Sequence, residues 1–305
     1  MNSRAIYLLP FISALMWGFA FILIVWCLQS MAPWWLMTYR CSLATLTYLL
    51  FFFFFKKVPT KLEWKWGTII GISFAGTLGF QAVGLTTTSI TNSSFLTVLY
   101  VVFTPLLGML FFKMKMRYSD WWMAAIALFG AYLLSGANLT TIKPGDIWTI
   151  ACAIIAALHL LLIAISPRSL NPHHLNAIQM FITMLFSGII SFSLNEPHPI
   201  LLPHLSMISI LTLGIVVSIV SFTLQFISMR YIPPGPAAII FLLESPFASL
   251  FAILLLGEKL TPIQSAGAAV IFLSSIVATY FHIRQPIAPK VIETPSLLDT
   301  TQPTG

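Results

Sequence analysis

The chain has 305 residues, of which 58% are hydrophobic and only 8% are charged, with a net charge of +7. Soluble domains carry about 25% charged residues, so this composition excludes a soluble fold and predicts that lipid surrounds the chain. The apolar residues form continuous runs without the alternation of a β-barrel, which indicates spanning helices. Basic loops on one membrane face account for the positive charge, and we expect no nucleic-acid partner.

Ten apolar segments follow one another along the chain. They cover residues 6–28, 34–55, 66–84, 92–112, 120–137, 146–166, 175–194, 206–228, 236–256 and 262–282. Most have about 18–23 residues, enough to cross a bilayer core of about 30 Å as a helix. We therefore predict an all-α integral membrane protein with ten transmembrane helices in a lipid bilayer.

Lysine and arginine predict the orientation, since cytoplasmic loops carry an excess of both residues. With the N-terminus in the cytoplasm, only Lys143 and Lys259 lie on the outer face. The basic residues on the inner face are Arg4, Lys56, Lys57, Lys61, Lys65, Lys113, Lys115, Arg117, Arg168, Arg230, Arg284 and Lys290. We expect a multi-pass protein of the cell inner membrane with cytoplasmic N- and C-termini.

The first three segments each carry one residue of interest. Trp17 in the first segment either fills core space or lines a solute path. Arg40 lies about two turns inside the outer end of the second segment, where it either extends to the interface or faces a cavity as an anion contact. Gln81 in the third segment either lines the same path or bonds one helix to another.

The fourth segment carries small and hydroxyl side chains at intervals of 4, 3, 4 and 4 residues. They are Ser93, Thr97, Tyr100, Thr104 and Gly108. This spacing puts all five on one face of a helix, and lipid would not favour hydroxyls. The face therefore points inward, either to line a cavity or to let helices approach closely.

Segments six to eight carry three further polar residues. His159 lies in the middle of segment six, where it would relay protons near neutral pH or serve as a hydrogen-bonded packing residue. Gln179 in segment seven is the repeat counterpart of Arg40, which favours an inward face for both. Gln225 in segment eight has the same two interpretations as Gln81.

Segment nine contains a single acid, Glu244, about 12 Å along the helix and near the middle of the membrane. An ionisable group at this depth costs about 2.5–3.5 kcal/mol on insertion scales, so it is compensated or used. Two interpretations remain open. Glu244 either lines the cavity and couples transport to protons, or it is a neutral acid that donates a hydrogen bond to a neighbouring helix.

Pro105 and Pro246 lie inside segments four and nine. Each proline removes a backbone hydrogen bond and bends its helix. Because the two prolines lie in matching positions of the two halves, they are candidate hinges for rocking between access states. A static kink is the alternative.

Weak internal similarity predicts a repeat. Pro33 opens segment two as Pro172 opens segment seven, and Gln81 of segment three corresponds to Gln225 of segment eight. Each half has five crossings, and because five is odd the second half must enter from the opposite side. This is a 5+5 inverted-topology repeat, which is common in secondary transporters. The expected units are a first repeat over 1–140, a second repeat over 141–284 and a disordered cytoplasmic tail over 285–305.

A set of short motifs connects the chain to a known family. The residues are Trp17-Gly18, Arg40, Phe95-Leu96-Thr97, Phe103-Thr104-Pro105, Leu243-Glu244-Ser245-Pro246, Gly257-Glu258-Lys259-Leu260-Thr261-Pro262 and Gly267. The pattern resembles the EamA family of the drug/metabolite transporter superfamily, over nearly the whole chain except the tail. That family usually places Glu directly before Pro. Here Ser245 intervenes and moves the carboxylate about 100° around the helix relative to the proline.

The resemblance implies a secondary transporter of small metabolites that works by alternating access. Export of amino acids or related metabolites is the first hypothesis. Uptake of a host metabolite such as S-adenosylmethionine, and drug export, are the alternatives. The residues expected to contact the solute are Trp17, Arg40, Gln81, Ser93, Thr97, Tyr100, Thr104, His159, Gln179, Gln225 and Glu244.

Other function classes lack sequence support. The chain contains no GxxxxGK loop for ATP, and no HExxH or GxSxG motif of the hydrolases. We expect no enzyme activity, no cofactor and no metal. A membrane enzyme or a membrane protein without transport remains a distant alternative. The expected partners are a small-molecule substrate, the lipid bilayer and protons, with the protein as a monomer or a homodimer.

Overall fold

A computed structural model describes residues 5–55, 58–114, 118–135 and 143–283. The described residues form helices joined by short connections and contain no β-strand. In these ranges nine helices are long and apolar enough to span a membrane, and α6, with 17 residues, is a shorter tenth crossing. The predicted all-α membrane fold with ten crossings is confirmed.

Five crossings make up the first half. They are α1 (Leu8–Leu28, preceded by the short helix η1, Ala5–Tyr7), α2 (Pro33–Phe55), α3 (Lys61–Leu85), the broken pair α4 (Ile90–Thr97) and α5 (Tyr100–Phe112), and α6 (Tyr118–Leu134). The second half has the same number. Its crossings are α7 (Pro144–Ile165), α8 (Pro172–Ser193), the continuous run α9 (His204–Leu211), η2 (Thr212–Ser221) and α10 (Phe222–Ser228), the broken pair α11 (Pro234–Phe241) and α12 (Glu244–Leu256), and α13 (Pro262–Ile283).

Local capping chemistry determines where α3 begins. The apolar pattern predicts a start at residue 66, but α3 begins at Lys61. The Thr60 hydroxyl accepts a hydrogen bond from the Glu63 backbone N–H at 3.2 Å, and the Glu63 carboxylate accepts one from the Thr60 N–H at 2.7 Å. This capping box satisfies free donors of the first turn, so the helix extends beyond the apolar run.

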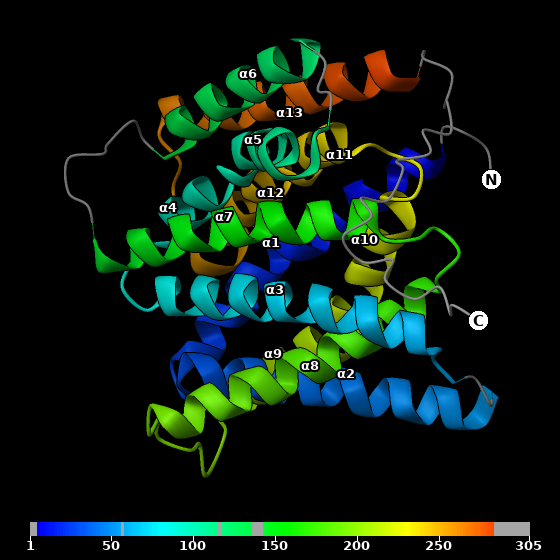
Figure 1. Cartoon of the computed structure of the whole chain (residues 1–305). Helices are drawn as coiled ribbons and strands as arrows, with labels where there is room; N and C mark the ends of the chain where they lie inside the picture. The colour runs from blue at the N-terminus through cyan, green and yellow to red at the C-terminus, as the bar shows by residue number, and fades with distance from the viewer. Residues whose placement is uncertain (1–4, 56–57, 115–117, 136–142, 284–305) are drawn as a thin grey trace, which may run out of the picture.

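The two halves enter the membrane from opposite sides. In Figure 1, α1 begins at the right-hand end of the bundle, whereas α7 begins at the left-hand end. Because each half has five crossings, α13 returns to the side from which α1 starts. The chain therefore has the inverted topology that the odd number of crossings in each half predicts.

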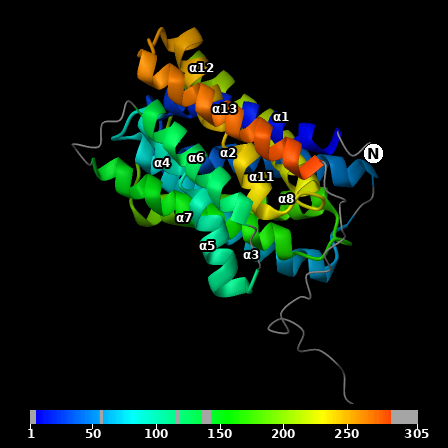
Figure 2. The same ribbon diagram turned by 90° about the horizontal axis from the view of Figure 1, so that it is seen from above.

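Two packing groups organise the bundle. α3 packs against α7 and α8, and α2 also packs against α8, which ties the halves together through the middle of the bundle. α6 and α13 form a second pair at one edge, as Figures 1 and 2 show. At Gly267 the α13 backbone approaches the α6 backbone at Gly130 and Leu134 so closely that a Cβ atom would not fit.

The distribution of side chains is that of a protein surrounded by lipid. Large apolar residues project from the outer surface, among them Phe53 (78% exposed) and Leu254 (66% exposed). Serine, threonine, asparagine and glutamine side chains are buried between the helices. Lipid offers no hydrogen bonds, so polar groups of this kind must find partners or water inside the bundle.

The eighth crossing contains a π-helix that the apolar pattern did not predict. It spans the ten residues of η2, Thr212–Ser221, whereas π-helices usually occur as single turns. Gly214 brings η2 against α2, where an added Cβ would lie 2.8 Å from the Arg40 carbonyl oxygen and 2.7 Å from Leu43 Cβ. The π-helix thereby places the hydroxyls of Ser218 and Ser221 beside the first half of the chain.

Candidate functional site

The two crossings that carry the candidate hinges Pro105 and Pro246 are both interrupted near their middle. The fourth crossing breaks at Val98 and Leu99 between α4 and α5, and the ninth breaks at Leu242 and Leu243 between α11 and α12. Thr97 and Tyr100 flank the first break, and Glu244 follows the second. Three of the predicted site residues therefore lie where the two helices are interrupted.

The second break follows directly from Pro246. The Leu242 carbonyl would accept a hydrogen bond from the N–H four residues later, and proline has none. Instead, Leu242 accepts a bond from the Ser245 N–H at 3.1 Å. Pro105 would free the carbonyl of Val101, which lies beyond the first break, so the first break is not positioned by its proline.

Ser245 connects the two broken crossings to each other. Its hydroxyl donates a 3.0 Å hydrogen bond to the Ser94 carbonyl oxygen of α4. The same carbonyl accepts a bond from the Val98 N–H at 3.3 Å, where the first helix begins to break. The residue that separates Glu244 from Pro246 in this chain thus forms a contact between the halves.

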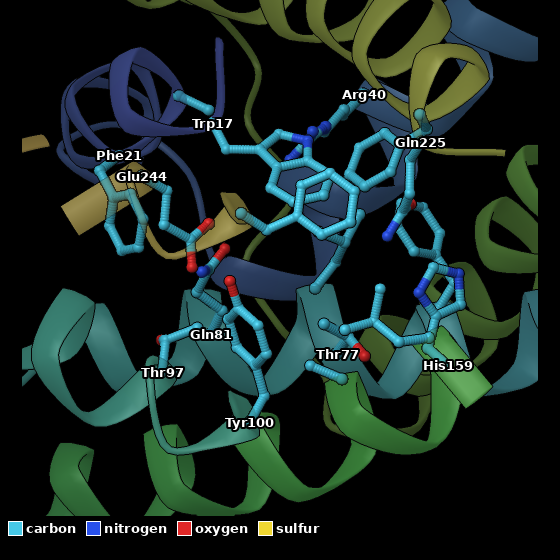
Figure 3. A pocket seen from close by; sticks show the side chains of 17 residues that line it. Trp17, Phe21, Arg40, Thr77, Gln81, Thr97, Tyr100, His159, Gln225 and Glu244 are labelled. Carbon is cyan, nitrogen blue, oxygen red and sulfur yellow. The ribbon is translucent and has the colours of Figure 1, made fainter. Parts of the chain in front are cut away.

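A central cavity lies beside the two breaks (Figure 3). Its volume is about 70 Å³, enough for several water molecules. The predicted site residues that line it are Trp17, Arg40, Gln81, Thr97, Tyr100, His159, Gln225 and Glu244. These residues come from both halves of the chain, as a solute site between inverted repeats requires.

Aromatic rings form much of the remaining lining, and the sequence analysis did not identify them. The missed residues include Phe21, Phe74, Phe222 and Phe241, with Thr77 as a further polar contributor. The Trp17 ring centroid lies 5.3 Å from that of Phe222 and 4.9 Å from that of Phe241. The chain has 25 phenylalanines, so position along the sequence could not distinguish cavity rings from lipid-facing ones.

Glu244 is buried in the cavity wall at 5% exposure. Its Oε1 atom has no hydrogen-bond partner among the described residues. Figure 3 shows its carboxylate and the Tyr100 hydroxyl directed into the same part of the cavity. A bond from Oε1 to a neighbouring helix is therefore absent among the described residues, and this buried oxygen would be satisfied by a proton or by rearrangement of the cavity around a solute.

Arg40 faces the cavity and does not extend to the interface. Its side chain is 1% exposed, its Nε donates a 2.8 Å hydrogen bond to the Ser218 hydroxyl, and its guanidinium carbon lies 5.8 Å from the centroid of the Phe222 ring. Among the described residues no acid forms an ion pair with Arg40, Glu244 included. The cavity therefore holds a carboxyl group and a guanidinium group that do not form an ion pair with each other.

A buried hydrogen-bond network supports one wall of the cavity. His159 Nε2 lies 3.1 Å from Gln179 Oε1, and the Gln179 amide donates to Asn176 Oδ1 at 2.8 Å. Asn176 in turn donates to the Tyr48 hydroxyl at 2.8 Å and to the Ser218 carbonyl oxygen at 3.1 Å. Gln179 is thus behind the cavity wall, and Asn176, which the sequence analysis missed, connects the surroundings of His159 and Arg40.

Besides Gln179, two further predicted residues, Ser93 and Thr104, lie outside the cavity lining. The Ser93 hydroxyl lies 3.4 Å from that of Thr149, and the Thr104 hydroxyl donates to the Tyr100 carbonyl oxygen at 2.7 Å. The prediction assumed one continuous helix over the fourth segment. The break at residues 98–99 interrupts that face, so Thr97 and Tyr100 reach the cavity while Ser93 and Thr104 serve in packing.

The two glutamines of the repeat both line the cavity. Gln225 Oε1 has no hydrogen-bond partner among the described residues, so this atom does not join helix to helix. Trp17 both lines the cavity and donates a 2.9 Å bond from its indole N–H to the Ser221 hydroxyl of η2. Within the described ranges no three His, Cys, Asp or Glu side chains lie close enough to hold a metal ion.

Comparisons with known proteins give one matching family, two related transporters and a solved structure with a similar fold. A family described as EamA-like transporter family matches residues 4–136 and again 143–280. A protein of Archaeoglobus fulgidus named "Uncharacterized transporter" is 32% identical over 268 residues, covering 87% of this chain and 83% of that one. A second "Uncharacterized transporter", of Methanothermobacter thermautotrophicus, is 25% identical and covers 65% and 59% of the two chains. One solved crystal structure has the same fold, with a TM-score of 0.74 at 17% identity over 91% of this chain and 99% of the other.

Proposed function

The chain belongs to the EamA-like transporter family, and from this premise we propose that it is a secondary transporter of small metabolites that works by alternating access. The family and the names of the relatives describe transporters rather than enzymes. The observation that carries the proposal is the central cavity, which both halves line and which both broken crossings reach. Rocking of one half against the other would expose such a cavity to each side of the membrane in turn.

The residues of the cavity favour a solute with both charges. The Glu244 carboxylate would pair with an ammonium group, and the Arg40 guanidinium would pair with a carboxylate. The aromatic rings of Trp17, Phe74 and Phe222 would pack against the apolar part of the solute. This supports an amino acid or related zwitterion as the substrate, with export as the direction that the family resemblance favours.

One observation supports an organic cation as an alternative substrate. An unpaired carboxylate beside several aromatic rings also suits an organic cation, because ring faces attract positive charge. S-adenosylmethionine, which carries a sulfonium and an amino-acid group, fits the same residues in the direction of uptake, and cationic drugs fit them for export. The proposed location is the cell inner membrane with both termini in the cytoplasm, and the gradient that drives transport is one of protons or of solute.

Counterflow in proteoliposomes tests the proposal. Liposomes with the purified chain would be loaded with unlabelled amino acids and then exposed to one labelled amino acid at a time, with S-adenosylmethionine as a parallel arm. We expect label to accumulate for at least one zwitterion, and to fail to accumulate with Thr97→Trp, which fills the cavity. Absence of accumulation for every solute in the wild type, with a correctly inserted protein, contradicts the proposal.

A further inference from the structure

A second, smaller cavity lies where α7 and α10 end. It is lined by residues that include Ile163, Ser166, Arg168, Leu175, Phe226 and Arg230, and we call it the arginine cavity. Arg168 belongs to the connection between α7 and α8, and Arg230 to the connection between α10 and α11. The cavity therefore lies just beyond the ends of two crossings that also line the central cavity.

The arginine cavity lies within about one helical turn of the central cavity along both crossings. On α7 the central cavity is lined by Leu160, and the arginine cavity by Ile163. On α10 the central cavity is lined by Gln225, and the arginine cavity by Phe226 and by Met229, which directly follows α10. At 1.5 Å per residue, Ile163 lies about 4.5 Å beyond Leu160 and Met229 about 6 Å beyond Gln225, and Phe226 is the residue next to Gln225. The two cavities thus lie in series along the same pair of helices.

Arg230, which lines this cavity, has an unsatisfied hydrogen-bond donor. Its Nη2 atom is buried and has no hydrogen-bond partner among the described residues. Among the described residues no Asp or Glu side chain forms an ion pair with Arg230. Burial lowers the pKa of the Arg230 guanidinium from its usual value, because desolvation disfavours the charged form. A buried donor of this kind gains free energy from any oxygen that reaches it.

The size and charge of the cavity define what it can hold. Its volume of about 10 Å³ accommodates one oxygen atom and excludes a whole metabolite. Two guanidinium groups favour a negatively charged oxygen. We propose that the arginine cavity is an anion subsite on the solute path, where Arg230 and Arg168 bind one oxygen of a carboxylate or phosphate group. The position of this subsite on a solute path rests on the proposed transport function. The binding of an anion by the two arginines does not depend on it.

Two sources of such an oxygen exist, a solute and a lipid headgroup. Both arginines lie within three residues of the ends of membrane crossings, Ile165 and Ser228, at the depth where lipid phosphates occur. The other lining residues favour the solute. Leu175, Phe226 and Met229 are 1%, 2% and 5% exposed, so one side of the cavity is formed by the protein core, while Arg168 lies on its exposed side.

Thermal unfolding of the full-length protein in lipid-free detergent tests the proposal. Sodium phosphate would be compared with sodium chloride at equal ionic strength. We expect phosphate to raise the Tm of the wild type, because a ligand that binds only the folded state stabilises it. Arg230→Gln should abolish the shift, and Arg168→Gln, which changes an exposed residue, should weaken the apparent affinity for phosphate about tenfold.

A variant that removes a distant positive charge is the control, and lipid vesicles test the alternative source of the anion. Lys61→Gln removes one exposed positive charge at the start of α3 and should retain the full shift. Equal shifts in the wild type and in both arginine variants, or no shift in any of them, would overturn the proposal. An arginine-dependent shift that appears only with phosphatidylglycerol vesicles would also overturn it, in favour of a lipid site.

Failure of this inference is distinguishable from failure of the proposed function. The phosphate experiment measures binding and needs no transported solute. If the arginine-dependent shift is present while counterflow fails for every solute, the anion subsite stands and the transport proposal falls. If counterflow succeeds while phosphate has no effect on any variant, the transport proposal stands and the subsite falls.

Discussion

Glu244 and Arg40 are buried ionisable residues of the central cavity that lack a partner of opposite charge within the described ranges. Neither forms an ion pair among the described residues, and Glu244 Oε1 has no hydrogen-bond partner. Burying a charge without a partner costs several kcal/mol, so such groups persist where they serve a purpose. Hydropathy alone could identify both residues, because each interrupts an apolar run. It could not show that they face the same cavity.

The Glu244→Gln variant tests proton coupling. We expect the amide to remove the dependence of the transport rate on pH, because it has nearly the shape of the acid but cannot bind or release a proton. Initial rates in proteoliposomes, measured over a pH series on both sides of the membrane, would show the change. Glu258→Gln, in the connection before α13, is the matched control and should keep the wild-type profile. An unchanged profile for Glu244→Gln would rule out coupling through this residue.

The Arg40→Met variant separates binding from stability. Methionine fills a similar volume without a charge, and replacing a buried charge by an apolar side chain is often neutral or stabilising. We expect the melting temperature to be retained or raised. The KM for a solute with a carboxylate should rise about tenfold to a hundredfold, the equivalent of a lost charged hydrogen bond of about 1.5–3 kcal/mol. A lower melting temperature with no change in KM would assign Arg40 a structural role instead.

At the scale of the elements, the positions of the helices follow from sequence better than their interruptions do. Apolar runs of spanning length predict where crossings lie, and helix starts at Pro33, Pro144 and Pro172 follow from the fixed backbone angle of proline. The break at Leu242 also follows from a proline. The break at Val98 and the π-helix of η2 have no such local signal, since both depend on packing between crossings.

Proline substitutions test the assignment of the two candidate hinges. Pro246→Ala supplies the N–H of a regular helical bond to the Leu242 carbonyl, which now accepts from the Ser245 N–H instead. This should favour the unbroken helix by about 1 kcal/mol, or about fivefold. We expect a slower transport turnover as the ninth crossing stiffens. Pro105→Ala should have a smaller effect, because its carbonyl partner at Val101 lies outside the break. Equal turnover rates for the two variants would show that Pro246 is a static kink.

A pair of glycine substitutions tests the packing of α1 against α12. A Cβ at Gly18 would lie 2.5 Å from Phe247 Cβ, 2.8 Å from the Ala248 nitrogen and 2.9 Å from the Glu244 carbonyl oxygen. We expect Gly18→Ala to destabilise the protein by about 1–3 kcal/mol in detergent unfolding. Gly188→Ala is the control, since its nearest neighbour is Thr38 Cγ2 at 3.7 Å, and alanine favours a helix by up to about 1 kcal/mol. Equal stabilities of the two variants would contradict this packing.

At the scale of the whole molecule, the fold could be predicted from the sequence because a lipid environment permits few kinds of backbone structure. Lipid requires helices, and the two halves of five crossings then enforce inverted topology. The residues of the site could be predicted from the sequence only in part. Polar residues such as Gln81 and Thr97 stand out in apolar runs, whereas cavity-lining rings such as Phe74 and Phe222 do not. The solute remains a proposal because two charges and several rings fit more than one metabolite.

Accessibility of the cavity from both sides of the membrane tests the central claim most directly. A single cysteine would be placed at Thr97, with the buried native residues Cys27, Cys41 and Cys152 replaced by serine or alanine. A membrane-impermeant thiol reagent would be added to one face of oriented vesicles at a time. A thiol reacts as the thiolate, which forms in water and not in hydrocarbon, so Leu254→Cys on the lipid-facing surface is the unreactive control. Alternating access predicts labelling of the Thr97 position from either face, and labelling from one face only, or from neither, would contradict it.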